Sequence, residues 1–239
     1  MSSIKFFPIA GVGVMIKFGD IIDFKINFLI RNVAQKISKI HGVIEIIPSY
    51  NDLCIHYDPS KILYEEICMI VDNLVNKCKD LKDNQNVNLV EIPVCYCEEF
   101  ALDKESVISH TKLDWDEIVK IHTSKNYLVY MMGFMPGFCY LGGMDERINT
   151  PRLKVPREQI PKGSVGLAGS QTGIYPWASP GGWKIIGKTP IKMYDIDRKI
   201  PSVVEAGDYI KFKTINLDEF KYILNQVENS NYEIIKRQI

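Results

Sequence analysis

The sequence lacks an excess of charge of either sign. Lys and Arg together number 29, and so do Asp and Glu, in a chain of 239 residues. Because surface binding of DNA, RNA or anionic lipid needs a basic excess, we expect no nucleic acid partner. No stretch approaches the roughly 18 uncharged apolar residues of a membrane span, and no basic region precedes an apolar run after Met1. We therefore expect a cytoplasmic protein that does not bind a membrane.

Cysteine is scarce and irregularly spaced. The six cysteines are Cys54, Cys68, Cys78, Cys95, Cys97 and Cys139. In a chain of this size such spacing does not suggest a disulfide scaffold. The Cys95 and Cys97 pair has no second pair of ligands at zinc spacing, so we expect no metal ligand set. No segment matches the Walker phosphate loop or the Gly-x-Gly-x-x-Gly fingerprint.

The first part of the chain alternates between strand and helix patterns. In order, period-two and helical spacings predict a strand at 12–18, a helix at 26–40, strands at 43–47 and 53–57, a helix at 63–78 and a strand at 90–94. This β-α-β-β-α-β order is typical of a ferredoxin-like α/β sandwich. The last strand either closes that domain or opens the next. With a polar linker after residue 78, we divide the chain into domains of residues 1–85 and 86–239.

The second part of the chain is rich in short strand patterns separated by Gly and Pro. We expect helices at 103–110, 114–123 and 217–227, and strands at 127–132, 165–168, 184–186, 191–194 and 209–213. Many short strands with such turn chemistry predict an all-β barrel or sandwich. The predicted fold class is therefore α+β, with a barrel domain that ends in a helix.

An aromatic and glycine-rich segment, residues 133–143, is the first candidate for a binding site. Its glycines permit positive φ and close backbone approach, and its aromatic side chains, Tyr140 among them, offer flat apolar walls. Either this loop lines a ligand pocket or it is a buried barrel corner packed by its own aromatics. The residue pattern is the same in both cases, and both alternatives stay open at this point.

Two arginines follow prolines closely in the sequence. Arg152 comes after Pro151 and Arg157 after Pro156. Each proline stiffens the backbone that presents a guanidinium, and two such groups suit a carboxylate or a phosphate. The alternative is that both are surface arginines paired with nearby acidic residues, namely Asp145, Glu146 or Glu158.

Further candidates follow the second arginine. The glycine-rich stretch 163–176 offers backbone N–H groups together with the side chains of Gln171, Thr172 and Tyr175, which could bind an oxyanion or an amide. Ser179 and Trp183 come shortly afterwards. His122 lies at the end of a predicted helix and continues its apolar stripe. A structural role and a role in proton transfer are both compatible with that position.

The motifs of the second part of the chain resemble those of one protein family. These motifs are Met132–Phe138, Tyr140–Gly143, Thr150–Arg152, Val155–Arg157, Gly163–Gly166, Gln171–Pro176 and Ser179–Trp183, with Phe18–Asp20 and His56–Pro59 in the first part. They resemble the family of B-type subunits of 5-oxoprolinase. That family includes the Kip inhibitor of a sporulation histidine kinase, proteins called allophanate hydrolase subunit 1, and one half of the urea carboxylase carboxyltransferase domain.

The resemblance implies a fold and an activity. It implies a small N-terminal α+β domain and a C-terminal cyclophilin-like β-barrel. It also implies a complex with a homologous C subunit and an A subunit, which opens 5-oxoproline to glutamate with ATP hydrolysis. The absence of a Walker loop is consistent with an ATP site shared between subunits.

The resemblance also allows a role to be assigned to each candidate residue. Arg152 and Arg157 would hold an anion, and Gln171 and Thr172 would orient the amide. The pocket would be lined by Tyr140, Tyr175 and Trp183. Ser179 would donate a hydrogen bond, and His122 is an outside candidate for proton transfer.

Two alternatives follow from the same resemblance. One is a regulatory protein that inhibits a histidine kinase, with the aromatic groove holding a helical segment of the kinase. The other is half of an allophanate or urea carboxylase-type carboxyltransferase. That second role would need separate partners to carry biotin, since the chain has no room for a carboxylase or carrier domain.

Overall fold

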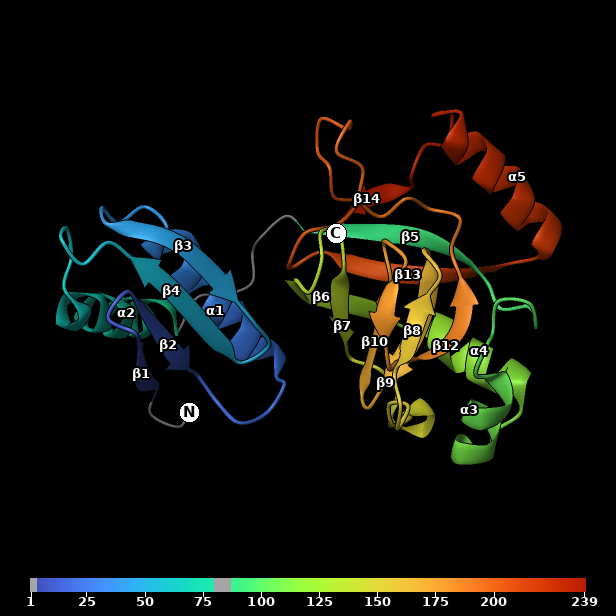
Figure 1. Cartoon of the computed structure of the whole chain (residues 1–239), viewed down its shortest axis with the longest axis horizontal. Coiled ribbons are helices and arrows are strands. Elements are labelled where there is room, and N and C mark those ends of the chain that lie inside the picture. Colours follow the sequence, from blue (N-terminus) through green and yellow to red (C-terminus); the bar gives the residue numbers. More distant parts are fainter. Residues whose placement is uncertain (1–3, 80–86) are drawn as a thin grey trace. The chain divides into compact units, whose positions relative to one another are not determined.

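The computed structural model describes residues 4–79 and 87–239, which divide into two compact units with the boundary after Gln85. The first unit contains, in chain order, β1 (Lys5–Ile9), β2 (Gly13–Lys17), α1 (Phe24–Ile37), β3 (Val43–Pro48), β4 (Asp52–Tyr57) and α2 (Tyr64–Cys78). Its four strands form an antiparallel sheet in the order β1-β2-β4-β3. Both helices pack on one face of this sheet (Figure 1).

The core of the first unit follows from the sequence periodicity. Alternate residues of β2 and β4, such as Val14 and Ile55, face the helices and are fully buried. Ile30 and Val33 of α1 and Ile67 of α2 meet them from the other side. The α1 helix begins where the Asp23 carboxylate accepts hydrogen bonds from the backbone N–H groups of Lys25 and Ile26.

The observed element order of this unit differs from the predicted one. It is β-β-α-β-β-α, because residues 88–95 belong to the sheet of the second unit and β1 occupies a sheet edge beside β2. A tight turn, in which the N–H of Val12 donates to the carbonyl of Ile9, folds β1 back onto β2. Residues 5–9, which contain Pro8, form a strand that the sequence pattern does not predict, but proline is tolerated on an edge strand.

The second unit is a closed barrel with attached helices. Its elements are β5 (Asn88–Cys95), α3 (Lys104–Thr111), α4 (Trp115–Ser124), β6 (Asn126–Met132), β7 (Cys139–Gly142), the 3-10 helix η1 (Glu146–Ile148), β8 (Arg157–Ile160), β9 (Ser164–Ala168), β10 (Gln171–Ile174), β11 (Ser179–Gly181), β12 (Lys184–Lys188), β13 (Tyr209–Ile215), α5 (Leu217–Glu228) and β14 (Lys236–Gln238).

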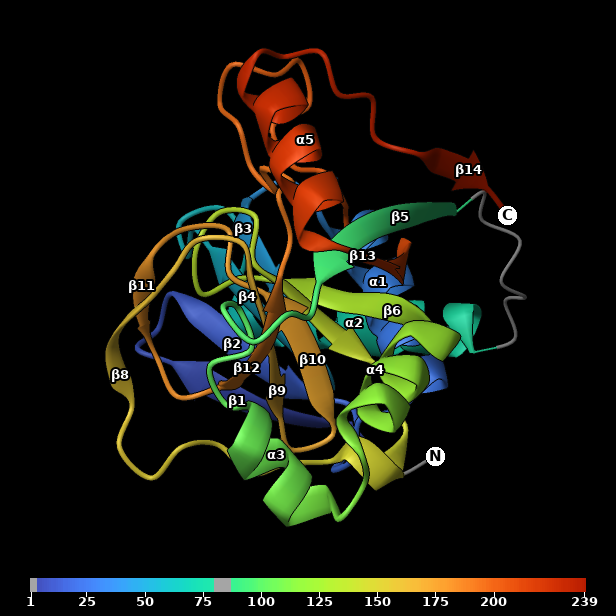
Figure 2. The same ribbon diagram turned by 90° about the vertical axis from the view of Figure 1, so that its right-hand side faces the viewer.

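Seven of these strands close the barrel in the order β12-β9-β10-β7-β6-β13-β5. Closure comes from the pairing of Lys188 in β12 with Cys95 in β5. The β5–β13 pair is parallel and the other pairings are antiparallel. β14 adds to the start of β5, and β8 pairs with β11 as a separate two-stranded sheet (Figure 2). The predicted α+β class with a barrel is confirmed.

The lumen of the barrel is filled with side chains. Val129, Leu141, Val165, Leu167 and Phe212 are buried in one continuous cluster. The strand predicted at residues 191–194 is wrong, since this segment is an irregular loop with a single bridge from Tyr194 to Ser202. Its β-branched and apolar residues are buried by loop packing rather than by a sheet ladder.

Candidate functional site

A pocket of about 400 Å³ lies on the outer surface of the barrel unit. Its lining residues are Phe134, Phe138, Tyr140, Arg152, Pro156, Tyr175, Pro180, Gly181, Gly182 and Trp183. They come from the β6–β7 loop, from β7, from the segment before β8, from the residue after β10, and from β11 with the two residues after it. Four of the predicted site residues therefore line one pocket, namely Tyr140, Arg152, Tyr175 and Trp183.

Strand alternation decides which side chains reach this pocket. In β7, Cys139 and Leu141 point into the filled lumen, and Tyr140 between them points outward. In β10, Gly173 faces outward beneath the Trp183 indole. A Cβ at Gly173 would lie 3.0 Å from Trp183 Cζ3. The Trp183 indole therefore forms the pocket floor, and it can pack directly on the barrel wall because Gly173 has no side chain.

The walls of the pocket are aromatic rings in edge-to-face contact. The Phe138 ring stands perpendicular to Tyr175 and Trp183, with centroids 5.1 and 5.5 Å away. Tyr140 lies 5.9 Å from Trp183 in the same T-shaped manner. Such pairs favour fixed geometry because ring edges meet ring faces. The rings form a rigid apolar cup that suits a small flat ligand.

Arg152 is the sole charged side chain among the lining residues. Its guanidinium carbon lies 5.9 Å from the centre of the Trp183 ring, and the side chain is exposed. Within residues 4–79 and 87–239 no carboxylate forms an ion pair with it, whereas Arg147, Arg157 and Arg198 each have an acidic partner. Arg152 is thus placed to bind an anion at the pocket mouth.

The two tyrosines of the pocket stay protonated at neutral pH. Burial raises the pKa of Tyr175 to about 12. Burial also raises the pKa of Tyr140, although the nearby Arg152 charge opposes this rise. Both phenols can therefore donate a hydrogen bond to a carbonyl oxygen.

Arg157 has a different position from Arg152. Its two terminal nitrogens donate to the two carboxylate oxygens of Asp103, at 2.9 and 2.8 Å. Asp103 is only 6% exposed and also accepts from the backbone N–H of Ile185 at 2.7 Å. Arg157 is absent from the pocket lining, and its guanidinium anchors the two-stranded β8–β11 sheet to the barrel. The structure therefore gives it an acidic partner, but Asp103 rather than one of the three predicted acids.

His122 and Thr172 lie inside the barrel, away from the pocket. His122 is fully buried, with Nδ1 2.8 Å from the Tyr96 hydroxyl and Nε2 2.9 Å from the Thr172 hydroxyl. The imidazole also stacks on Phe212, with ring centroids 4.5 Å apart. Burial lowers the pKa of His122 to about 3. This geometry supports the structural role, because a fully buried ring inside the lumen cannot pass a proton to a ligand in the pocket.

Gln171 and Ser179 also lie outside the pocket lining. Gln171 begins β10, where it pairs with Ala168 at the β9–β10 turn. The Ser179 hydroxyl is buried and donates to the carbonyl of Pro180. Conversely, Phe134, Phe138 and the glycines at positions 181 and 182 line the pocket but are not among the predicted site residues. Residues 133–143 already contained the signal for the two phenylalanines, but only the fold shows which side chains face outward.

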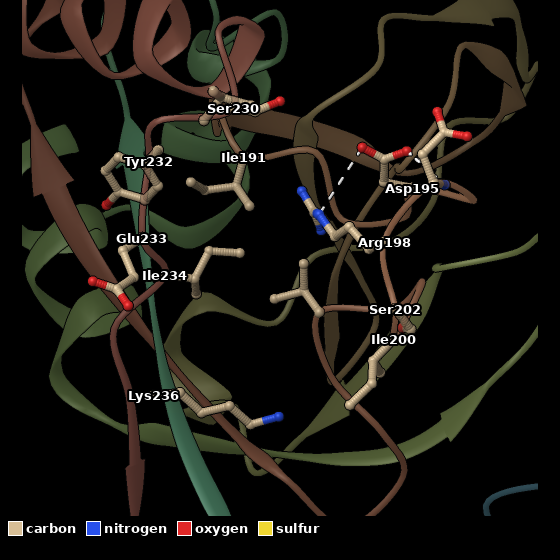
Figure 3. Close-up of a pocket in the computed structure, with 13 residues that line it drawn as sticks. Ile191, Asp195, Arg198, Ile200, Ser202, Ser230, Tyr232, Glu233, Ile234 and Lys236 are labelled. Carbon is tan, nitrogen blue, oxygen red and sulfur yellow. Dashed lines mark hydrogen bonds and ion pairs between the residues drawn. The ribbon is translucent and has the colours of Figure 1, made fainter.

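A second cavity of about 440 Å³ lies between residues 191–203 and the C-terminal segment 227–236. Figure 3 shows Arg198 turned toward Asp195 on one wall, with Tyr232 and Lys236 on the other. Its two cationic side chains are already paired within the chain, Arg198 with Asp195 and Lys236 with Asp208. This cavity therefore offers a weaker anion site than the pocket at Arg152.

The part of the chain that the structure describes holds neither a cluster of metal ligands nor a membrane-spanning helix. No group of three or more His, Cys, Asp or Glu side chains is arranged to hold a metal ion there. No helix among residues 4–79 and 87–239 combines the length and the apolar character needed to cross a membrane.

Known proteins resemble this chain in sequence and in structure. The B-type subunit of the Bacillus subtilis 5-oxoprolinase is 39% identical over 219 residues, which cover 87% of this chain and 91% of that protein. A conserved uncharacterized protein of Pyrococcus horikoshii, of known crystal structure, is 41% identical with a TM-score of 0.54, over 90% of this chain and 100% of the other.

A more distant solved structure shares the fold over nearly the whole chain. The urea carboxylase of Kluyveromyces lactis superposes with a TM-score of 0.84 at 17% identity, over 99% of this chain and 24% of that much longer one. The carboxyltransferase domain, subdomain C and D, matches residues 4–204. Since that match spans both units, the chain belongs to the carboxyltransferase C and D subdomain family, together with the bacterial 5-oxoprolinase B subunits.

Proposed function

We propose that the chain is the B-type subunit of a 5-oxoprolinase, which acts with a homologous C subunit and an A subunit to open 5-oxoproline to glutamate. The observation that carries this proposal is the position of Arg152, an exposed guanidinium over the Trp183 ring at the mouth of an aromatic pocket. The sequence identity to 5-oxoprolinase B subunits from three bacteria supports it.

The pocket chemistry matches a small lactam that carries a carboxylate. The Arg152 guanidinium would bind the carboxylate of 5-oxoproline in bidentate fashion. The flat lactam ring would lie against Trp183, and a phenol of Tyr140 or Tyr175 would donate to the lactam carbonyl. Enclosure by Phe138 and its neighbours would exclude water from the ring and strengthen these polar contacts.

ATP does not fit this pocket as it stands. A triphosphate carries several negative charges, and the pocket has a single cation and no glycine-rich phosphate loop. We therefore propose that ATP binds at a site completed by a partner subunit. ATP would supply a phosphoryl group to the amide oxygen and leave as ADP. Attack of water on the activated carbonyl would then break the ring C–N bond and release phosphate and glutamate. The residues of this chain would hold and orient the lactam during that step.

The finer fold assignments are also proposals. The first unit would be ferredoxin-like. In the β-α-β-β-α-β order the last strand occupies a sheet edge, and here β1 occupies that edge instead. The second unit would be cyclophilin-like. What supports both is the sheet order, with two helices on one face of the first sheet and seven strands closing the second.

The test is to co-express the chain with its C-type and A-type partners and to measure ADP release that depends on 5-oxoproline. In the assembled complex we expect Arg152→Ala to raise KM for 5-oxoproline about tenfold or more, because a charge-assisted pair is lost. Arg147→Ala is the matched control, since that arginine pairs with Asp145 outside the pocket. If Arg152→Ala leaves KM unchanged, the assignment of this pocket as the 5-oxoproline site is wrong.

A different result would overturn the proposed function itself. A complete wild-type assembly that releases no ADP with 5-oxoproline rules out this activity. A chain that recruits no such partners and instead blocks histidine kinase autophosphorylation would identify it as the inhibitor type of the family.

A further inference from the structure

Phe134 occupies a backbone conformation that is unfavourable for its residue type. Its φ is +67°, in the left-handed region, where a side chain with a Cβ is strained and glycine or asparagine is usual. It lies in the loop between β6 and β7, whose ends pair through Met132 and Cys139. A glycine at this position would satisfy the turn at a lower energy.

The Phe134 side chain gains little from burial in return. It is 64% exposed, one of the most exposed large apolar side chains of the barrel unit. Its ring stands perpendicular to the Phe138 ring with centroids 5.6 Å apart, and most of the side chain stays in solvent. The strained backbone lowers stability, and the largely exposed ring gains little from burial to offset that cost.

The loop around Phe134 is held in place rather than loose. The N–H of Gly133 donates to the carbonyl of Phe138, and the N–H of Phe138 donates to the carbonyl of Met135. Gly137 has φ +83° and packs so closely on Tyr194 that an added Cβ would lie 2.5 Å from the Tyr194 Cβ. These contacts fix where the Phe134 ring stands.

The ring stands at the pocket mouth. Phe134 and Arg152 are both exposed and both line the pocket, while the other aromatic rings form its floor and walls. We infer that Phe134 is a specificity-determining residue, whose ring covers the apolar face of the substrate while Arg152 holds its carboxylate. Binding of substrate then buries the ring, which compensates for the strain stored in the loop. This inference rests on the proposed function.

The test uses three substitutions in the assembled complex, with 5-oxoproline as the ligand. Phe134→Tyr keeps the ring, and its KM stays within about twofold of wild type. Phe134→Ala and Phe134→Gly remove the ring, and both raise KM about tenfold with kcat changed less than about threefold. A rise in KM with little change in kcat identifies contact with the bound substrate rather than a role in the chemical step.

The melting temperature of the purified chain separates strain from packing. At positive φ, glycine is less strained than alanine, so Phe134→Gly melts above Phe134→Ala by about 2–4 °C. Lys112 is the matched control, because it also has positive φ, at +59°, but lies at the end of α3 outside the pocket. The melting temperature of Lys112→Gly should exceed that of Lys112→Ala by a similar margin, and neither substitution should change KM.

Three outcomes would overturn the inference. If Phe134→Ala and Phe134→Gly keep the wild-type KM, the Phe134 ring does not contact the substrate. The Arg152→Ala result then decides separately whether the proposed substrate site stands. Loss of co-purifying partner chains in Phe134→Ala, with no change in KM of the residual complex, makes the ring an assembly contact instead. A wild-type assembly that does not turn over 5-oxoproline overturns both the proposed function and this inference.

Discussion

His122 shows how a single buried residue takes its chemical state from its neighbours. The Thr172 hydroxyl donates its hydrogen to the carbonyl of Gly166, so it accepts from His122 Nε2–H. The other ring nitrogen, Nδ1, then accepts from the Tyr96 hydroxyl. Both nitrogens are satisfied only when the imidazole is neutral. A second proton, on Nδ1, would face the hydroxyl hydrogen of Tyr96 and would put a charge in the barrel lumen.

We predict that His122 makes stability depend on pH. Its pKa is about 3 in the folded chain and near 6.5 when unfolded. Above pH 6.5 the residue is neutral in both states and contributes no pH dependence. Between pH 6.5 and about 3 only the unfolded state takes up the proton, so stability falls as pH falls, by about 1.4 kcal/mol per pH unit.

Urea unfolding of wild type and His122→Gln at pH 7 and pH 5 checks this prediction. From pH 7 to pH 5, His122 should lower the unfolding free energy of the wild type by about 2 kcal/mol. In His122→Gln this contribution is absent, so its unfolding free energy should fall by about 2 kcal/mol less than that of the wild type. His110→Gln, at an exposed position of α3, serves as the control. If His122→Gln does not fold, the wild-type ring can be followed by ¹⁵N NMR, and a ring that is charged at pH 5 contradicts the prediction.

Arg152 and Arg157 show that the same Pro-Arg dipeptide can lead to different roles. Both follow a proline, and they are five positions apart in the chain. Arg157 meets the buried carboxylate of Asp103, which lies 54 residues earlier, and becomes part of the scaffold. Arg152 has an indole beneath it instead. The difference is a tertiary one, because the partner of each arginine lies far from it in the sequence.

At the scale of strands, the pocket depends on glycines on the outer barrel face. Gly166 of β9 and Gly173 of β10 pair directly across the sheet. The side chain of Trp183 packs against both, and a Cβ at Gly166 would lie 3.1 Å from the Trp183 Cβ. A larger side chain at either position would lift the indole from the barrel wall. The outward face of two neighbouring strands therefore sets the depth of the pocket.

We predict that Gly173→Ala destabilises the barrel unit and damages the pocket. The new methyl group would lie 2.8 Å from the Cys139 carbonyl oxygen and 3.0 Å from the Trp183 ring, so strand and indole must both shift. The expected loss is about 1–3 kcal/mol of unfolding free energy, with a higher KM for 5-oxoproline in the assembled complex.

Tryptophan fluorescence and urea unfolding of the purified chain measure this effect. Gly182→Ala is the control, because the nearest atom to its added Cβ is 3.7 Å away, and it should unfold like wild type. Wild-type stability and KM in Gly173→Ala would show that the indole does not depend on this close approach.

At the scale of the whole molecule, the chain has two separate hydrophobic cores. The core of residues 4–79 is built around Val14, Ile30 and Ile55, and the barrel core around residues such as Ile92 and Leu141. All three tryptophans, Trp115, Trp177 and Trp183, belong to the second unit. Their fluorescence reports the barrel alone, whereas far-ultraviolet circular dichroism reports both units.

We predict that a cavity in the first core unfolds the first unit alone. Ile30 is fully buried in α1, and Ile30→Ala should cost about 2–5 kcal/mol. Circular dichroism should then show an early transition, while the tryptophan transition stays at its wild-type midpoint. Ile44→Ala is the control, since this side chain of β3 is 71% exposed. An equal shift of both signals would mean that the two units unfold as one.

The sequence alone determined the properties that depend on local spacing. Helical periodicity placed α1, α2, α4 and α5 to within a few residues, and alternation placed β2 and β4. The order of strand and helix patterns indicated an α+β chain with a barrel, and motifs between residues 132 and 183 identified the family. It also named four residues that line the pocket, because aromatic and cationic side chains clustered there in the sequence.

Tertiary structure alone decided which side of each strand faces a ligand. Neighbouring residues on a strand point to opposite faces, so Tyr140 reaches the pocket while Thr172, equally prominent in the sequence, binds His122 in the lumen. Long-range partners such as Asp103 decided which arginine stays available. Strand pairing likewise assigned residues 5–9 and 88–95 to their sheets. Local sequence patterns do not predict strand pairing, the face of a strand that meets a ligand, or ion pairs. All three depend on residues that are far apart in the chain.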